Sequence, residues 1–123
     1  MPLLEADEDF IKGKGYSYEV VDQPGLVHLL LHDYPLPEAY DPPQVALLIR
    51  LPAGFPNSKP DMFWTIPPVR LAGGGCPEGA GVTETHIGRS WQRWSRHCAS
   101  WRPGVDDLQS YLAAIQNELA KGR

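Results

Sequence analysis

Proline and glycine interrupt this chain so often that only short secondary-structure elements fit between them. Thirteen prolines and 12 glycines are spread through the 123 residues. Proline has no backbone N–H to donate and is disfavoured in the middle of helices and central strands. The sequence therefore predicts short strands that are joined by rigid turns.

Four intervals between these breaks have the composition of β-strands. Residues 16–21 (YSYEVV) alternate, residues 26–32 (LVHLLLH) are largely apolar, and the turn-forming residues 22–25 (DQPG) join them. Residues 45–51 (VALLIRL) and 62–66 (MFWTI) follow two proline-rich loops. We expect these runs to form a four-stranded antiparallel meander.

Two segments carry helical signals. Residues 5–12 are short and acidic and predict a helix of about two turns. Residues 108–119 repeat apolar side chains at helical spacing, with acidic residues before them and basic residues after them, which suits the helix dipole. The expected fold class is α+β, a four-stranded antiparallel meander sheet with a packed C-terminal helix, in one domain over residues 1–123.

Charge and cysteine content limit the possible functions. The net charge of −4 argues against a dedicated nucleic-acid binder, because phosphate contacts need a basic surface. Only Cys76 and Cys98 are present, too few for a disulfide framework. The N-terminus has no signal-peptide pattern, and no apolar run is long enough to span a membrane. We expect a cytoplasmic protein with free thiols and no membrane or nucleic-acid partner.

Residues 89–102 (RSWQRWSRHCASWR) are the segment most suited to chemistry. They hold four of the 11 basic residues and three of the four tryptophans. His97 directly precedes Cys98, and Ser95 lies three residues before Cys98. Nearby positive charge favours the thiolate form of cysteine, which is the form that attacks an acyl group. The alternative is that the His97–Cys98 pair is incidental, because neighbouring residues of a strand point to opposite faces.

Two other interpretations of this segment remain open. Interleaved arginine and tryptophan residues can bind single-stranded nucleic acid, although the acidic balance of the chain opposes this. Cys76, His86, His97 and Cys98 are potential zinc ligands, but their spacing matches no compact zinc motif. We therefore expect no metal ion and no other cofactor.

The order of the predicted elements resembles the ubiquitin-conjugating (E2, UBC-like) fold. Residues 55–60 (FPNSKP) stand where that family has an F/Y-P-x-x-x-P stretch, and residues 101–103 (WRP) stand where it has W-x-P. Residues 61–64 (DMFW), 91–97 (WQRWSRH) and 101–106 (WRPGVD) resemble one branch more closely, the prokaryotic E2 family E. This resemblance covers nearly the whole chain.

The resemblance implies a bacterial E2-like conjugating enzyme. Such an enzyme accepts the activated C-terminus of a ubiquitin-like protein from an E1-like activating enzyme and passes it to a target. A JAB-type or other processing peptidase belongs to the same kind of pathway. The alternative is a non-catalytic E2 variant that binds the E1 or the ubiquitin-like protein as a scaffold.

The acceptor signature of the E2 family is missing from this chain. There is no His-Pro-Asn motif followed by Cys-Leu, and the residue eight positions before Trp101 is Arg93 where most E2 domains have the acceptor cysteine. Two acceptors stay open: Cys98, which gives a thioester, and Ser95, which gives an oxyester with His97 as its base. Cys76, in the glycine-rich residues 73–81, is a third choice.

The resemblance also implies roles for the neighbours of the acceptor. His97 is expected to act as a base or to orient the acceptor, and Arg96 to stabilise the carbonyl oxyanion with nearby amides. Trp94, Trp101 and Pro103 are expected to shape the wall around the acceptor.

Overall fold

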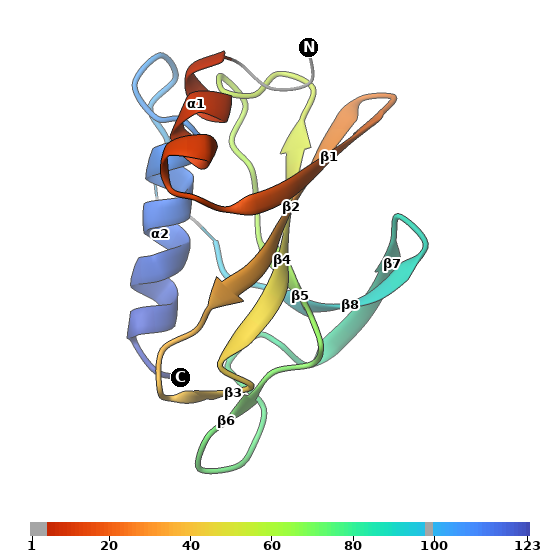
Figure 1. Ribbon diagram of the computed structural model, residues 1–123, viewed down its shortest axis with the longest axis vertical. Helices are drawn as coiled ribbons and strands as arrows, with labels where there is room; N and C mark the ends of the chain where they lie inside the picture. Colours follow the sequence, from red (N-terminus) through yellow and green to blue (C-terminus); the bar gives the residue numbers. More distant parts are fainter. Residues whose placement is uncertain (1–4, 98–99) are drawn as a thin grey trace.

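The computed structural model describes residues 5–97 and 100–123 and confirms the α+β class. In chain order its elements are α1 (Glu5–Gly13), β1 (Ser17–Gln23), β2 (Leu26–Pro35), β3 (Tyr40–Asp41), β4 (Gln44–Pro52), β5 (Phe63–Ile66), β6 (Arg70–Leu71), β7 (Val82–His86), β8 (Arg89–Trp94) and α2 (Leu108–Ala120). A six-stranded sheet has the order β1-β2-β4-β5-β8-β7, and β3 pairs separately with β6. Figure 1 shows α2 beside this sheet. Strands β7 and β8 lie at the end of the sheet that is farther from α1.

The predicted meander forms one part of the observed sheet. The four predicted strands are β1, β2, β4 and β5, and each pairs antiparallel with the next. The hairpin of β7 and β8 extends this sheet, because β8 pairs antiparallel with β5. These two strands were not predicted, since their many polar residues hide the apolar alternation on which strand prediction depends.

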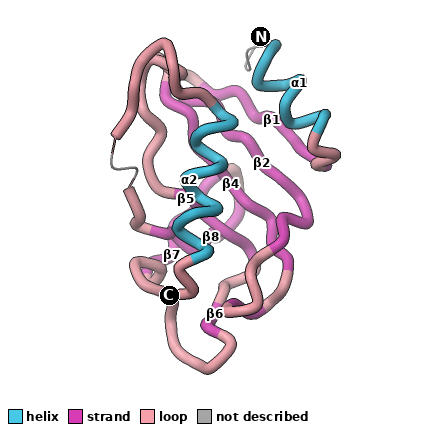
Figure 2. The backbone as a smooth tube through the Cα atoms, turned by 90° about the vertical axis from the view of Figure 1, so that its left-hand side faces the viewer, coloured by secondary structure: helices cyan, strands magenta, loops and turns pink. Residues whose placement is uncertain are grey.

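Side chains alternate between the two faces of the sheet and build a core on each. The face covered by α2 buries Leu29, Leu31, Leu47 and Ile49 from β2 and β4 against Leu112 and Ile115 of the helix. The opposite face buries Leu30, Leu48, Trp64 and Trp91. Figure 2 shows α2 lying across the first of these faces. The β7–β8 hairpin contributes to the second core through Trp91 of β8, which is fully buried.

The predicted C-terminal helix is confirmed, and its start is fixed by a capping box. The Asp107 side chain accepts a hydrogen bond from the Ser110 amide at 3.1 Å, and the Ser110 hydroxyl accepts one from the Asp107 amide at 2.7 Å. Helix α1 contributes the fully buried Ile11 to the same core. The position of α2 over the sheet is therefore set by its cap and by its buried apolar stripe.

Glu84 connects the β7–β8 hairpin to the second face of the sheet. Its carboxylate accepts hydrogen bonds from His86 Nε2 at 2.9 Å, Trp64 Nε1 at 2.9 Å and Arg93 Nη1 at 2.7 Å. The hydrogen bond from His86, followed by those from Trp64 and Arg93, lowers the pKa of Glu84 to about 2 despite the opposing effect of burial.

The low pKa of Glu84 predicts an acid-dependent loss of stability. The ordinary pKa of a glutamate is 4.5, so ionised Glu84 stabilises the fold above that pH, and its contribution is lost as the pH falls toward 2. Urea unfolding at several pH values should show that Glu84→Gln is less stable than wild type at pH 7 and loses less stability between pH 4.5 and 2. The exposed Glu38→Gln variant should follow wild type. Identical pH profiles for wild type and Glu84→Gln would contradict this prediction.

Candidate functional site

Residues 95–103, which we call the connecting segment, follow β8 and contain the predicted catalytic residues. Trp94, the last residue of β8, is fully buried; its ring stacks on Phe63 at 5.2 Å and its Nε1 donates to Thr65 Oγ1 at 2.9 Å. Trp94 therefore supports the segment from the core. Cys98, the first-choice acceptor, lies outside the described residues.

Ser95, the second predicted acceptor, lies half-buried against the glycine-rich loop. Its amide donates to the Gly79 carbonyl oxygen at 2.8 Å. A Cβ atom at Gly79 would lie 3.0 Å from the Ser95 carbonyl oxygen, and Gly79 has a φ of +73°. The Ser95 hydroxyl has no hydrogen-bond partner within residues 5–97 and 100–123. Glycine is thus needed at position 79 for the backbone to approach Ser95 this closely.

Arg96 connects three parts of the chain. Its Nε donates to the Glu78 carbonyl at 3.0 Å, its Nη1 donates to the Glu118 carbonyl at 3.1 Å, and its Nη2 donates to the carbonyl of Arg123. The guanidinium carbon also lies 4.9 Å from the centre of the Trp94 ring. Arg96 thereby holds the end of β8 against the last turn of α2, and its role at an oxyanion stays a prediction.

His97 pairs with a carboxylate that sequence reasoning did not single out. His97 Nδ1 lies 2.6 Å from Asp61 Oδ1, and both side chains are substantially exposed, at 57% and 44%. When Nδ1 carries the proton that is donated to the carboxylate, Nε2 is left as the nitrogen that accepts a proton. Asp61 opens the DMFW stretch that carried the family resemblance, which was the only signal available for it.

The loop before β5 is held at two further points, one on the connecting segment and one on α2. Trp101 Nε1 donates to the Pro56 carbonyl at 2.8 Å, and the Tyr111 hydroxyl donates to the Met62 carbonyl at 2.5 Å. Met62 has a φ of +60°, in the left-handed region that is costly for a residue other than glycine. These bonds hold Met62 in that conformation, which places the neighbouring Asp61 beside His97.

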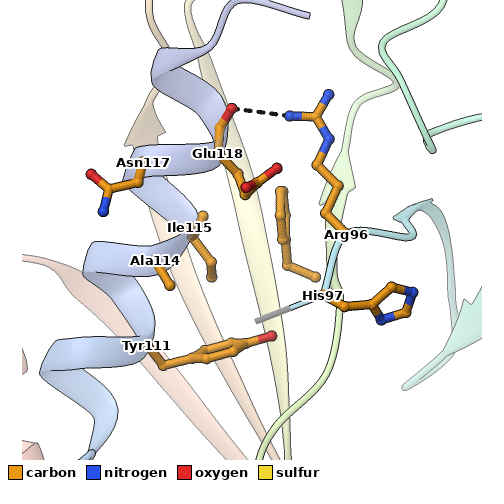
Figure 3. Close-up of a pocket in the computed structure, with 8 residues that line it drawn as sticks. Arg96, His97, Tyr111, Ala114, Ile115, Asn117 and Glu118 are labelled. Atoms are coloured by element: carbon orange, nitrogen blue, oxygen red, sulfur yellow. Dashed lines mark hydrogen bonds between the residues drawn. The ribbon is translucent and has the colours of Figure 1, made fainter. Parts of the chain in front are cut away.

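A pocket of about 200 Å³ separates the connecting segment from α2. Figure 3 shows Arg96 and His97 on one side of it and Tyr111, Ala114 and Ile115 of the helix on the other. It is smaller than the usual site for a drug-sized ligand. A single side chain or the end of an extended peptide is a better match for its size.

The remaining predicted residues lie apart from this pocket. Pro103 is exposed beyond Trp101, and Cys76 is exposed in the glycine-rich loop. His86 belongs to the Glu84 cluster, whereas His97 belongs to the Asp61 pair. Within the described ranges, no three His, Cys, Asp or Glu side chains are grouped as metal ligands.

Two structural findings bear on the nucleic-acid and membrane alternatives. Trp91 and Trp94 are fully buried, so neither ring is available to stack on a base. In the part of the chain that is described, no helix has the length and apolar character needed to cross a membrane.

A model of the family described as Prokaryotic E2 family E matches residues 3–122. The chain belongs to this family. Comparisons with curated proteins and with solved structures gave no match. Membership confirms the predicted UBC-like fold class and gives the family E protein an E2-like role in ubiquitin-like conjugation.

The tight contact at Gly79 predicts a larger cost for alanine there than at Gly88 or Gly81. Gly88 has a similar φ of +77° but has open space around its Cβ position, and Gly81 also has open space. We expect Gly88→Ala to cost about 1 kcal/mol, Gly79→Ala about 2–4 kcal/mol because overpacking against Ser95 adds to the strain, and Gly81→Ala little. Urea unfolding measures all three. Equal costs at positions 79 and 88 would exclude the close contact with Ser95.

Proposed function

We propose that this family E protein is a conjugating enzyme whose acyl acceptor lies in the connecting segment, at Cys98 or Ser95. It takes the activated C-terminus of a ubiquitin-like protein from an E1-like enzyme and passes it to a target. The observation that carries this proposal is the pairing of His97 with Asp61 at 2.6 Å. It supports a general base at a residue that lines a pocket and is within two positions of both candidate acceptors in the sequence.

The surroundings of Arg93 support an acceptor in this segment. Arg93 occupies the position eight residues before Trp101 and lies in β8. Its Nη1 binds Glu84 on the face of the sheet that carries Trp64 and Trp91. That face is opposite α2 and away from His97, so the usual acceptor position is used here for a structural ion pair. We infer that the acyl group is received elsewhere, and the connecting segment contains a thiol and a hydroxyl within two residues of His97 in the sequence.

The chemistry at Cys98 is a pair of acyl transfers. In the first, the Cys98 thiolate attacks the carbonyl carbon of the E1 thioester, a new C–S bond forms, and the E1 thiolate leaves. In the second, a nucleophile of the target attacks the new thioester, the Cys98 thiolate leaves, and His97 Nε2 takes the proton of the nucleophile. Asp61 fixes the imidazole ring and stabilises the imidazolium that forms.

Ser95 serves the same two steps with a different proton path. Its hydroxyl proton moves to His97 Nε2 as the serine oxygen attacks the carbonyl carbon of the E1 thioester. The C–S bond breaks, the E1 sulfur leaves and takes that proton back as a thiol, and an oxyester results. In either case the pocket between α2 and His97 receives the last residues of the ubiquitin-like tail. Neither route requires a metal or an organic cofactor.

The partners follow from the same proposal. An E1-like enzyme supplies the activated acyl group, a ubiquitin-like protein is the group transferred, and a JAB-type or other peptidase processes it. Trp101 supports the wall of the site through its bond to Pro56. A cytoplasmic location keeps Cys98 reduced and able to form a thioester.

An adduct assay tests the acceptor directly. The protein is mixed with an E1-like enzyme, a ubiquitin-like protein and ATP, and the products are separated with and without a thiol reductant. We expect an adduct that the reductant removes and that is absent from Cys98→Ala but present in Cys76→Ala, because thiolate attack requires the acceptor sulfur.

Other outcomes of the same assay are equally informative. An adduct that resists the reductant, is cleaved by hydroxylamine and is absent from Ser95→Ala would move the acceptor to Ser95. If the E1 is charged and wild type forms no adduct, the proposed enzyme activity is wrong. In that case the protein is a non-catalytic E2 variant, and retention on immobilised ubiquitin-like protein would show the scaffold role.

A further inference from the structure

The face of the sheet opposite α2 carries a second pocket, which shares only Asp61 with the residues of the proposed reaction. We call it the Arg50 pocket. It has a volume of about 300 Å³ and lies at the end of β4, beside the loop that leads into β5. Its lining includes Leu26, Arg50, Lys59, Asp61, Trp64 and Glu84.

Arg50 is held in this pocket by two buried aromatic side chains. Its Nε lies 3.3 Å from His28 Nε2, and its guanidinium carbon lies 5.4 Å from the centre of the Trp64 ring. His28 is only 1% exposed. Because the arginine Nε–H can only donate, His28 Nε2 must accept, and the imidazole that does so is neutral.

The charge around His28 agrees with this assignment. Burial is the main cause that lowers the pKa of His28, and the positive charge of Arg50 lowers it further. The partner of Arg50 is therefore an uncharged ring, and the half-buried guanidinium has no ion-pair partner among the described residues.

Both carboxylates that line the pocket are occupied by other donors. Glu84 is bonded to Trp64, His86 and Arg93, and Asp61 is bonded to His97. In the described part of the chain Arg50 forms no ion pair, whereas the exposed Arg70 pairs with Asp41 at 3.1 Å. Arginine seldom lies in a partly buried position without an anionic partner.

We propose that the Arg50 pocket binds a small organic carboxylate with an apolar body. The guanidinium fork matches a carboxylate with two parallel hydrogen bonds, and only its Nε is used by the described residues. Leu26 and Trp64 supply an apolar wall for the body of the ligand, and the exposed Lys59 adds a second positive charge at the rim. This binding is a separate activity from the proposed acyl transfer, although Asp61 lines the pocket and also pairs with His97.

NMR titration with benzoate tests the proposal. The indole N–H of Trp64 and the Nε–H of Arg50 are followed at pH 7 and constant ionic strength. We expect both signals to shift and to saturate with benzoate, and acetate to bind more weakly because it has no apolar body. Arg50→Gln should weaken benzoate binding at least tenfold, while Arg70→Gln, which removes an exposed arginine of the same charge, should bind as wild type.

Further variants separate binding from folding. Arg50→Lys keeps the charge but loses the fork, so we expect it to weaken benzoate binding several-fold while its urea unfolding stays close to that of wild type. A linear, unsaturated response in wild type would overturn the site, and so would unchanged binding in Arg50→Lys or in a folded Arg50→Gln. Equal binding of acetate and benzoate would overturn the apolar part of the ligand.

Discussion

The burial of Trp94 is the constraint on which the candidate site depends. Its indole is fully enclosed, stacked on Phe63 and bonded to Thr65, and these contacts fix the end of β8 in the middle of the core. These contacts of Trp94 therefore limit the direction in which the chain continues after β8. Arg96 lies over the same ring and bonds to the last turn of α2, so His97 emerges at a set position beside the helix. Catalysis by positioning requires that a functional residue has a rigid structural support.

Asp61 contacts His97 because the loop before β5 is also held in place by hydrogen bonds. The bond of Trp101 to Pro56 fixes the loop before β5 to the connecting segment, and the bond of Tyr111 to Met62 fixes it to α2. The left-handed backbone conformation of Met62 is energetically unfavourable, and the surrounding contacts maintain it. Strain of this kind is common at functional sites, and here it sets the direction of the carboxylate. Asp61 also lines the Arg50 pocket, so one loop residue borders both proposed sites.

Local patterns were enough to predict much of the fold. The C-terminal helix and the first four strands of the sheet follow from apolar periodicity within single segments. Strands β7 and β8 do not, because Glu84 and Arg93 pair across the hairpin and look like surface residues in the sequence. His97 was found through its neighbours in the chain, but its contact with Asp61 spans 36 positions and depends on tertiary packing. The carbonyl partners of Arg96 are backbone groups, which leave no trace in side-chain identity.

In the proposed reaction, His97 is oriented by Asp61 and moves the proton during acyl transfer. The most direct test of this role is the single-turnover discharge of the charged protein to an amine, compared between wild type and Asp61→Asn. Asn keeps the size of the side chain but removes the charge that stabilises the imidazolium. We expect Asp61→Asn to be charged normally by the E1-like enzyme and to discharge at least about tenfold more slowly than wild type. The control variant Asp22→Asn should discharge at the wild-type rate. Discharge at the wild-type rate in Asp61→Asn would contradict the proposed role of Asp61.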